Sequence, residues 1–152
     1  MSMNDLEQAF HLIEDNAGGD FEGPKPDHLI ENAEATLGLS FPPTYREFLR
    51  RLGAGDIAGA EFYGVIKDDF IHSSVPDAIW LTLDERKNSN LPESLIIVAD
   101  TGYGHYYAID VSKKTATEES PIVEWSPGDN SSQVVADDFG AFLLQRLREA
   151  VQ

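Results

Sequence analysis

The sequence contains no cysteine and few basic residues, and each of these shortages excludes a class of function. Without cysteine, disulfide bonds, thiolate catalysis and cysteine-ligated zinc or iron–sulfur sites are all excluded. Only 11 lysines and arginines stand against 27 aspartates and glutamates, so the net charge is −16. That charge opposes binding to nucleic-acid phosphates or to an anionic membrane. We therefore expect a basic protein partner, although many cytoplasmic proteins carry excess carboxylates for solubility alone.

The sequence also lacks a long apolar run and a basic stretch near residue 1. No apolar segment approaches the roughly 18–20 residues of a membrane span, and residues 1–25 are polar and acidic. We therefore expect a cytoplasmic protein. With 152 residues and 41% apolar content, the chain can bury one core, and we expect a single domain over residues 1–152.

Three amphipathic helices are predicted in the first third of the chain. The first has apolar residues at helical spacing over residues 6–13 and ends at a pair of glycines. The second is expected to start with Asp27 as its N-cap and to end at Gly38, in the left-handed conformation that glycine adopts easily. The third follows Pro42, because proline is tolerated in a first helical turn, and presents Tyr45 on its apolar face.

The remaining two thirds of the chain mix strand and helix patterns. In order, the patterns predict a strand at 61–66, a helix at 76–86, strands at 95–98, 105–111 and 121–125, and a helix from Val135 to Ala150. The turn at 101–104 joins two of these strands into a hairpin. Helices followed by strands and a closing helix are typical of an α+β fold, here with helices packed on a mainly antiparallel mixed sheet.

The sequence offers little support for catalysis or metal binding. None of the four histidines stands in a hydrolase, zinc-protease or phosphate-loop motif. Asp100, His105 and Asp110 could hold a divalent metal in principle, but the two aspartates lie at opposite ends of the predicted hairpin. We expect Asp110 to form a turn instead. We therefore expect no catalytic residue, no metal and no cofactor, with a hydrolase that uses His105 and Asp100 as the minor alternative.

Acidic and aromatic side chains are the candidates for contacts with a partner. Aromatic rings bury much area and keep a polar group, although core packing is the alternative for each of them. Tyr106 and Tyr107 must point to opposite faces of a strand, so we expect one to pack and one to be available. An acidic loop would steer a cationic partner. The candidate contact residues are Asp68, Asp69, Trp80, Tyr103, His105 and Tyr107.

Two parts of the chain combine weak motifs in a distinctive order. The first is Ile30-Glu31-x-Ala33-Glu34-x-x-Leu37-Gly38-Leu39-x-Phe41-Pro42-x-x-Tyr45-x-x-Phe48-Leu49, followed by Gly53-Ala54-Gly55 and a strand that ends Phe62-Tyr63-Gly64. The second is Asp100-x-Gly102-x-Gly104-x-Tyr106-x-x-Ile109-Asp110, followed by Pro121-Ile122-Val123-Glu124-Trp125 and the last helix. Over residues 25–150 this order resembles the SUKH superfamily. Phe41 stands where leucine is common, and Ala54 lies inside the glycine cluster, but both keep the apolar or small character.

The resemblance implies a small α+β domain that acts as a protein-binding module. Bacterial members are commonly immunity proteins that neutralise toxins, many of them nucleases, encoded beside them. A regulatory scaffold that recruits cellular proteins, as the fungal cell-wall regulator of the family does, is the alternative. The family offers no catalytic set to transfer, and the motif residues are implied to be structural. The structural candidates are Gly38, Pro42, Tyr45, Leu49, Gly53, Gly55, Gly64, Asp110, Trp125 and Phe142.

Overall fold

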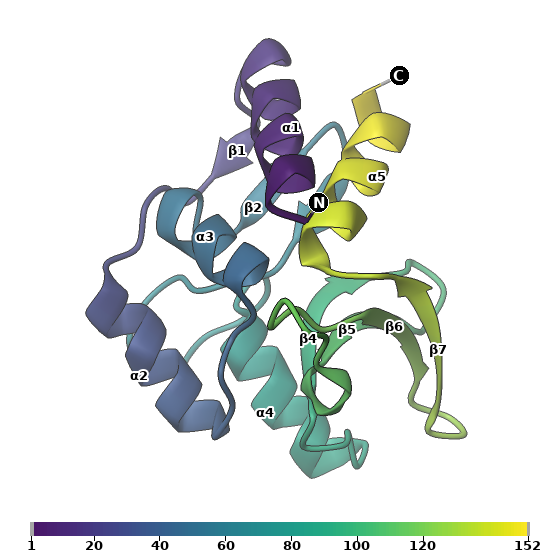
Figure 1. Cartoon of the computed structure of the whole chain (residues 1–152). Helices are drawn as coiled ribbons and strands as arrows, with labels where there is room; N and C mark the ends of the chain where they lie inside the picture. The colour runs from purple at the N-terminus through teal and green to yellow at the C-terminus, as the bar shows by residue number, and fades with distance from the viewer. Residues whose placement is uncertain (1, 152) are drawn as a thin grey trace.

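Helices and two antiparallel sheets make up the structure, a computed structural model that describes residues 2–151 (Figure 1). The elements are α1 (Ser2–Asp15), β1 (Asp20–Phe21), α2 (Asp27–Leu37), α3 (Pro43–Arg51), β2 (Gly55–Ile57), β3 (Ala60–Phe62), α4 (Ala78–Asn88), β4 (Leu95–Asp100), β5 (Tyr106–Asp110), the 3₁₀ turn η1 (Val111–Lys113), β6 (Ile122–Ser126), β7 (Ser131–Ala136) and α5 (Phe139–Val151). The predicted α+β class with antiparallel strands is confirmed. The strands form two sheets rather than one, in the orders β1-β2-β3 and β4-β5-β6-β7.

The four-stranded sheet lies between α4 and α5. Successive residues of β4 point to opposite faces, as the pleat requires. Ile96 belongs to the large hydrophobic cluster that includes Leu143 of α5, whereas Ile97 belongs to a smaller cluster with Leu81 of α4. The sheet is therefore buried on both faces over β4, which explains why the sequence there is continuously apolar.

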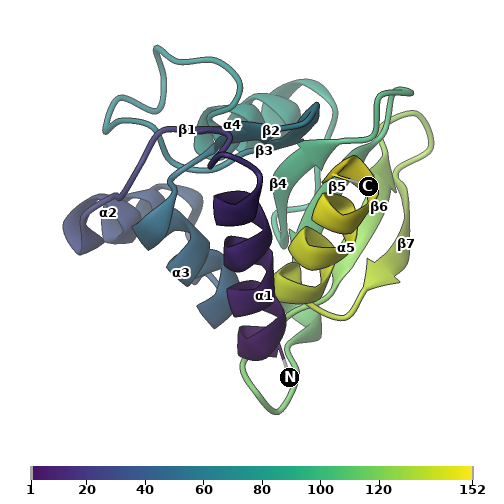
Figure 2. The same cartoon turned by 90° about the horizontal axis from the view of Figure 1, so that it is seen from above.

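The larger cluster is centred on aromatic rings from the helices. Tyr45 and Phe48 of α3 lie 4.9 and 5.2 Å from the ring of Phe139, which begins α5. The buried hydroxyl of Tyr45 donates to the carbonyl oxygen of Tyr63 at 2.9 Å, so its polar group is satisfied. Helix α1 runs beside α5 in both views (Figures 1 and 2), and its apolar stripe is buried there. Helices distant in sequence thus share one core.

A close backbone contact fixes the segment between β3 and α4. A Cβ atom added to Gly64 would lie 1.8 Å from the carbonyl oxygen of Gly53. The backbone of Gly64 accepts a hydrogen bond from Ala78 N and donates one to Pro76 O. Only glycine fits this position, because the neighbour is backbone and not a flexible side chain.

The start of α2 differs from the prediction, whereas its end agrees. Pro26 occupies the N-cap position with extended backbone, and Asp27 is the first helical residue. The carboxylate of Asp27 binds the guanidinium of Arg50 at 2.8 Å instead of capping its own helix. Gly38 closes α2 at φ 73° and donates to Glu34 O, as expected for a left-handed C-cap.

Two other predicted boundaries were wrong. The sequence pattern predicts Val135 in the last helix, but it lies in β7, and α5 begins at Phe139. The few apolar residues before the helix fit both the period of a helix and that of a strand. Pairing with β6 makes this segment a strand. The strand predicted at 61–66 covers only Ala60–Phe62, because Gly64 turns away into the bridge with Asp77.

Candidate partner-binding surface

The six predicted contact residues fall into two groups. Asp68, Asp69 and Trp80 lie around α4, whereas Tyr103, His105 and Tyr107 lie at the β4–β5 turn and on β5. Within residues 2–151, no hydrogen bond or ring contact joins the two groups. No single motif predicts a surface that contains all six residues. The structure does not bring the six together into one surface either.

In the first group, Trp80 lines a shallow hollow beside α4, and Asp68 and Asp69 directly precede Phe70 and Ile71, which line it too. Asp69 accepts hydrogen bonds from the backbone N–H groups of Ile71 and His72, at 3.2 and 3.0 Å. The hydrogen bond from the His72 backbone lowers the pKa of Asp69, so the carboxylate is ionised at neutral pH. This turn buries Phe70 and leaves Ile71 68% exposed against Trp80 at the hollow. Charge and apolar area therefore lie together here.

Four further carboxylates lie around Tyr63 and Tyr106, and one of them, Asp84, lines this hollow. They come from β3, α4 and the end of β4: Glu61, Asp84, Glu85 and Asp100. Burial, followed by the charges of Glu85 and Asp100, raises the pKa of Tyr106 to about 12. Burial, followed by the charges of Asp100 and Glu61, has the same effect on Tyr63.

We call Glu61, Asp84, Glu85 and Asp100, with Trp80 and Tyr106 beside them, the acidic surface. Three of its carboxylates are placed by direct geometry: the Tyr106 hydroxyl donates to Glu85 at 3.4 Å, Asp100 is the strand partner of Tyr106, and Asp84 lines the hollow with Trp80. Lys87 also lines that hollow, so the field is not purely negative. Sequence patterns missed the surface, because its carboxylates come from three elements and adjacent acids such as Asp84 and Glu85 carry no motif.

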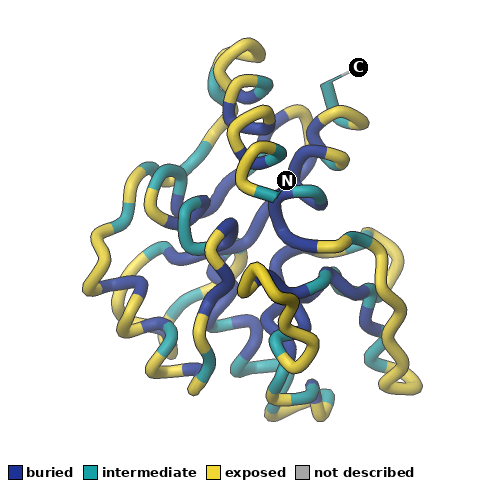
Figure 3. The backbone as a smooth tube through the Cα atoms, in the orientation of Figure 1, coloured by how far each residue is buried: buried dark blue, intermediate teal, exposed yellow. Residues whose placement is uncertain are grey.

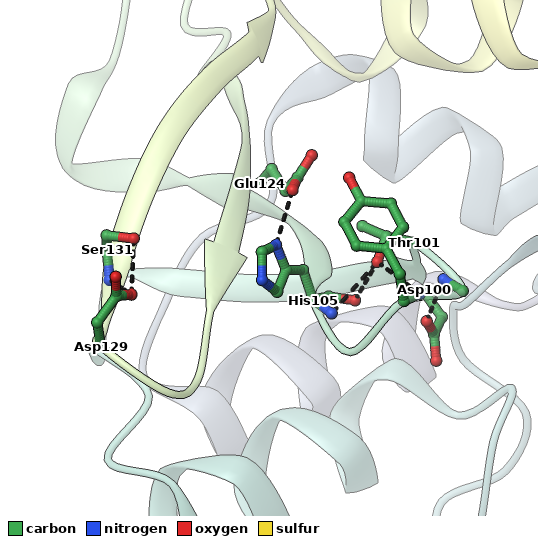
Figure 4. A network of polar contacts seen from close by, with 8 residues as sticks. Asp100, Thr101, His105, Glu124, Asp129 and Ser131 are labelled. Carbon is green, nitrogen blue, oxygen red and sulfur yellow. Dashed lines mark hydrogen bonds and ion pairs between the residues drawn. The ribbon is translucent and has the colours of Figure 1, made fainter.

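The second group is built on the β4–β5 turn (Figure 4). The Asp100 carboxylate accepts from Gly102 N at 2.7 Å and shapes the turn, which leaves Tyr103 63% exposed. The Tyr103 ring lies edge-on to His105 at 5.2 Å, and His105 Nδ1 lies 2.8 Å from Glu124 Oε2. This hydrogen bond lowers the pKa of Glu124, and the Tyr103 side chain adds to the effect.

Neither tyrosine of the Tyr106–Tyr107 pair is freely available, contrary to the sequence prediction. The two rings point to opposite faces of β5 as expected. However, Tyr106 stacks on Trp125 at 6.3 Å, and Tyr107 packs on Phe142 at 5.1 Å. The sheet carries a helix on each face, so both rings find a hydrophobic neighbour and are half-buried.

The structure gives His105 and Asp100 separate partners. Asp100 binds the turn backbone, and His105 binds Glu124, and no side-chain hydrogen bond joins the two within residues 2–151. Within residues 2–151, no serine or threonine hydroxyl hydrogen-bonds the imidazole of His105, and no group of three histidines or acids is placed to hold a metal ion. Over the same residues, no helix combines the length and apolar character needed to cross a bilayer.

The structural candidates occupy turns and core positions. Asp110 accepts from the backbone N–H of Ser112 at 3.0 Å and thereby shapes η1. Trp125 is fully buried and donates its Nε1–H to Asn130, and Phe142 is buried against Phe62 and Tyr107. The other candidates with buried positions are Pro42, Tyr45, Leu49, Gly53, Gly55 and Gly64.

Two buried carboxylates that the sequence did not single out join the sheet to the helices. Glu119 accepts from Thr44 N at 3.0 Å and from Thr44 Oγ1 at 2.8 Å, which caps the first turn of α3. Thr44 Oγ1 in turn accepts from Gly140 N of α5, and Asp138 accepts from Ala141 N. Burial raises the pKa of Glu119 and of Asp138, and the charge of Asp138 adds to the effect on Glu119.

Replacing Glu119 by glutamine is expected to flatten the dependence of stability on pH. Because its pKa is raised on folding, the native state holds this proton more tightly than the unfolded chain does. The resulting stability is fully present below the unfolded pKa and is lost as pH rises through the higher folded pKa. Urea unfolding of both proteins from about pH 4 to about pH 8 measures the difference. Parallel pH profiles would show that Glu119 is not buried with a raised pKa.

The chain matches a known protein family. The model of the family SUKH_6, described as SMI1-KNR4 cell-wall, matches residues 27–143. The matched segment runs from the first residue of α2 into α5 and includes the four-stranded sheet. It therefore covers more than half of the chain and both parts of the motif order in the sequence.

Proposed function

Because the chain belongs to the SUKH_6 family (SMI1-KNR4 cell-wall), whose members are generally non-catalytic protein-interaction modules, we propose that it is an immunity-type inhibitor. Its partner is a basic toxin domain of the nuclease type, bound in the cytoplasm through the acidic surface. The observation that carries this proposal is that Glu61, Asp84, Glu85 and Asp100 lie around Tyr63 and Tyr106, with Asp84 also lining the Trp80 hollow.

The chemistry of a nuclease supports this choice of partner. A nuclease must present a positive surface to its phosphate substrate, and an acidic inhibitor can occupy the same surface. The net charge of −16 adds long-range attraction to the local contacts. Trp80 and Ile71 supply apolar area within the charged rim, the combination from which interface hot spots are usually built. Asp68 and Asp69 extend the charge along the adjoining loop.

Co-expression tests the function directly. The chain is expected to restore growth to cells that produce a toxin encoded beside its gene, and the purified proteins should form a complex. Affinity capture separates the alternative function. One cationic toxin domain supports an inhibitor, whereas a set of wall-synthesis or signalling proteins would support the regulatory scaffold and overturn the proposal.

Neutralising part of the acidic surface is expected to slow association with the toxin domain. The variant that combines Asp84→Asn with Asp100→Asn keeps an oxygen for the Gly102 hydrogen bond and removes two charges. At low salt the association rate constant should fall by up to about tenfold, and the dissociation rate should change less, because steering acts before contact. Stopped-flow measurements at two salt concentrations give both rates.

A matched control removes two charges elsewhere. Glu14→Gln with Asp15→Asn neutralises exposed carboxylates at the end of α1, which lies far from α4 in Figure 1. If both double variants slow association equally, the effect is due to net charge, and the acidic surface is not the contact site. Physiological salt screens charges beyond about 8 Å, so the difference between variants should shrink there.

A further inference from the structure

Strand β7 forms an open edge of the four-stranded sheet (Figure 3). Its residues Ser131 to Val135 are all exposed, including Val134 at 49% and Val135 at 39%. Apart from its ladder with β6, no backbone–backbone hydrogen bond among residues 2–151 involves this strand. A strand edge of this kind carries a row of N–H and C=O groups that can pair with another strand.

The opposite edge of the same sheet is not open in this way. Tyr63 N donates to Val98 O at 2.7 Å, so the segment after β3 covers the middle of β4. Soluble proteins commonly protect an edge with lysine, proline or a bulge. β7 contains neither lysine nor proline, and its one irregularity, at Val135, leaves the stretch from Ser131 to Val134 in regular register.

We propose that β7 accepts an extended, basic segment of the partner as an added strand of the sheet. Asp129 precedes the strand and Asp137 follows it, and both are exposed. Hydrogen bonds from Ser131 lower the pKa of Asp129, which is therefore ionised. A segment with small or β-branched residues in its centre and lysine or arginine at its ends matches this pattern of an uncharged strand between two carboxylates.

A second copy of the chain fits this edge poorly. Antiparallel pairing of β7 with itself, centred between Gln133 and Val134, would bring Asp129 of one copy next to Asp137 and Asp138 of the other. Like charges opposed across strands are destabilising, and two chains of charge −16 also repel each other. The inference rests on the proposed binding of a basic partner. It adds that the partner binds through backbone hydrogen bonds to β7.

The test uses a short synthetic peptide that alternates threonine and valine and ends in a lysine on each side. Amide hydrogen exchange of the intact protein is followed residue by residue by NMR, with and without the peptide. At a free peptide concentration of ten times Kd, the outward-facing amides between Ser131 and Val134 are expected to exchange about tenfold more slowly. A peptide with the same charge and two central prolines should give no slowing, because proline cannot continue the ladder.

Variants of the protein give a second readout. Gln133→Lys places a positive charge on the edge, and its pairing with Glu124 across from it on β6 preserves the fold. This variant should bind the peptide at least about tenfold more weakly, whereas Ala35→Lys, the same charge change on exposed α2, should bind nearly as the original chain does. Unchanged binding by Gln133→Lys, or equal slowing by the proline peptide, would overturn the inference.

The outcomes also separate this inference from the proposed function. Peptide protection of β7 without rescue of toxin-producing cells would support the strand edge and contradict the inhibitor function. Rescue by the chain, with β7 amides that exchange equally fast in the free protein and in the toxin complex, would support the inhibitor and overturn strand addition.

Discussion

Replacing Gly64 by alanine is expected to destabilise the protein by about 3 kcal/mol or more, at the upper end of overpacking effects. The added methyl group would lie 1.8 Å from the carbonyl oxygen of Gly53 and 2.8 Å from Leu49 Cδ2. Relief requires the backbone to move, which would break the hydrogen bond from Val65 N to Gly53 O. Urea unfolding measures the loss, a large part of the 5–15 kcal/mol of a typical domain.

Gly128→Ala is the matched control for this substitution. Gly128 has no backbone strain, and a Cβ there meets nothing within 4 Å, so the same chemical change should shift stability by less than about 0.5 kcal/mol. If Gly64→Ala unfolds at the same urea concentration as the original chain, the close approach between Gly53 and Gly64 does not exist.

Phe142→Ala is expected to cost about 3–5 kcal/mol, the usual range for a buried aromatic side chain. The ring of Phe142 lies 5.1 Å from Tyr107, 6.2 Å from Phe139 and 6.4 Å from Phe62. Its removal leaves a cavity where the sheet, β3 and α5 meet, and rigid neighbours can fill little of that space. The midpoint of urea unfolding should fall, while the slope of the unfolding free energy against urea concentration should change little.

Phe142→Leu distinguishes lost packing from lost folding. Leucine refills part of the same space, so its cost should lie clearly below that of alanine. An unchanged midpoint for Phe142→Ala would mean that α5 packs on the sheet through other residues. Equal costs for the two variants would point to a requirement for the ring itself rather than for its volume.

The sequence predicted those elements in which the spacing of apolar residues and the residues at the element's ends indicate the same segment. The apolar spacing and Gly38 identify α2, and the apolar run at 95–98 with the glycine turn identifies the β4–β5 hairpin. β1 and β2 were missed, because strands of two and three residues have no detectable period. Asp27 was expected to cap α2, but Pro26 takes the N-cap position, and the Asp27 carboxylate forms an ion pair with Arg50 of α3 instead.

The candidate site could be predicted only in part. The exposure of Tyr103 follows from its glycine-flanked turn, which is a local property. The grouping of Asp84, Asp100 and Glu61 depends on how α4, β4 and β3 pack together, and no spacing along the chain encodes that. The partial burial of Tyr107 likewise depends on α5, 35 residues further along the chain at Phe142.

The cap on α3 also bears on when the protein can fold during its synthesis. Helices α1 to α3 leave the ribosome first, but the acceptor for Thr44 N is Glu119, 75 residues later. The ring of Phe139 that packs on Tyr45 and Phe48 follows later still. Until then the first turn of α3 has an unpaired amide, and its aromatic face is exposed to solvent. The nascent N-terminal helices therefore await the last third of the chain before their own core exists.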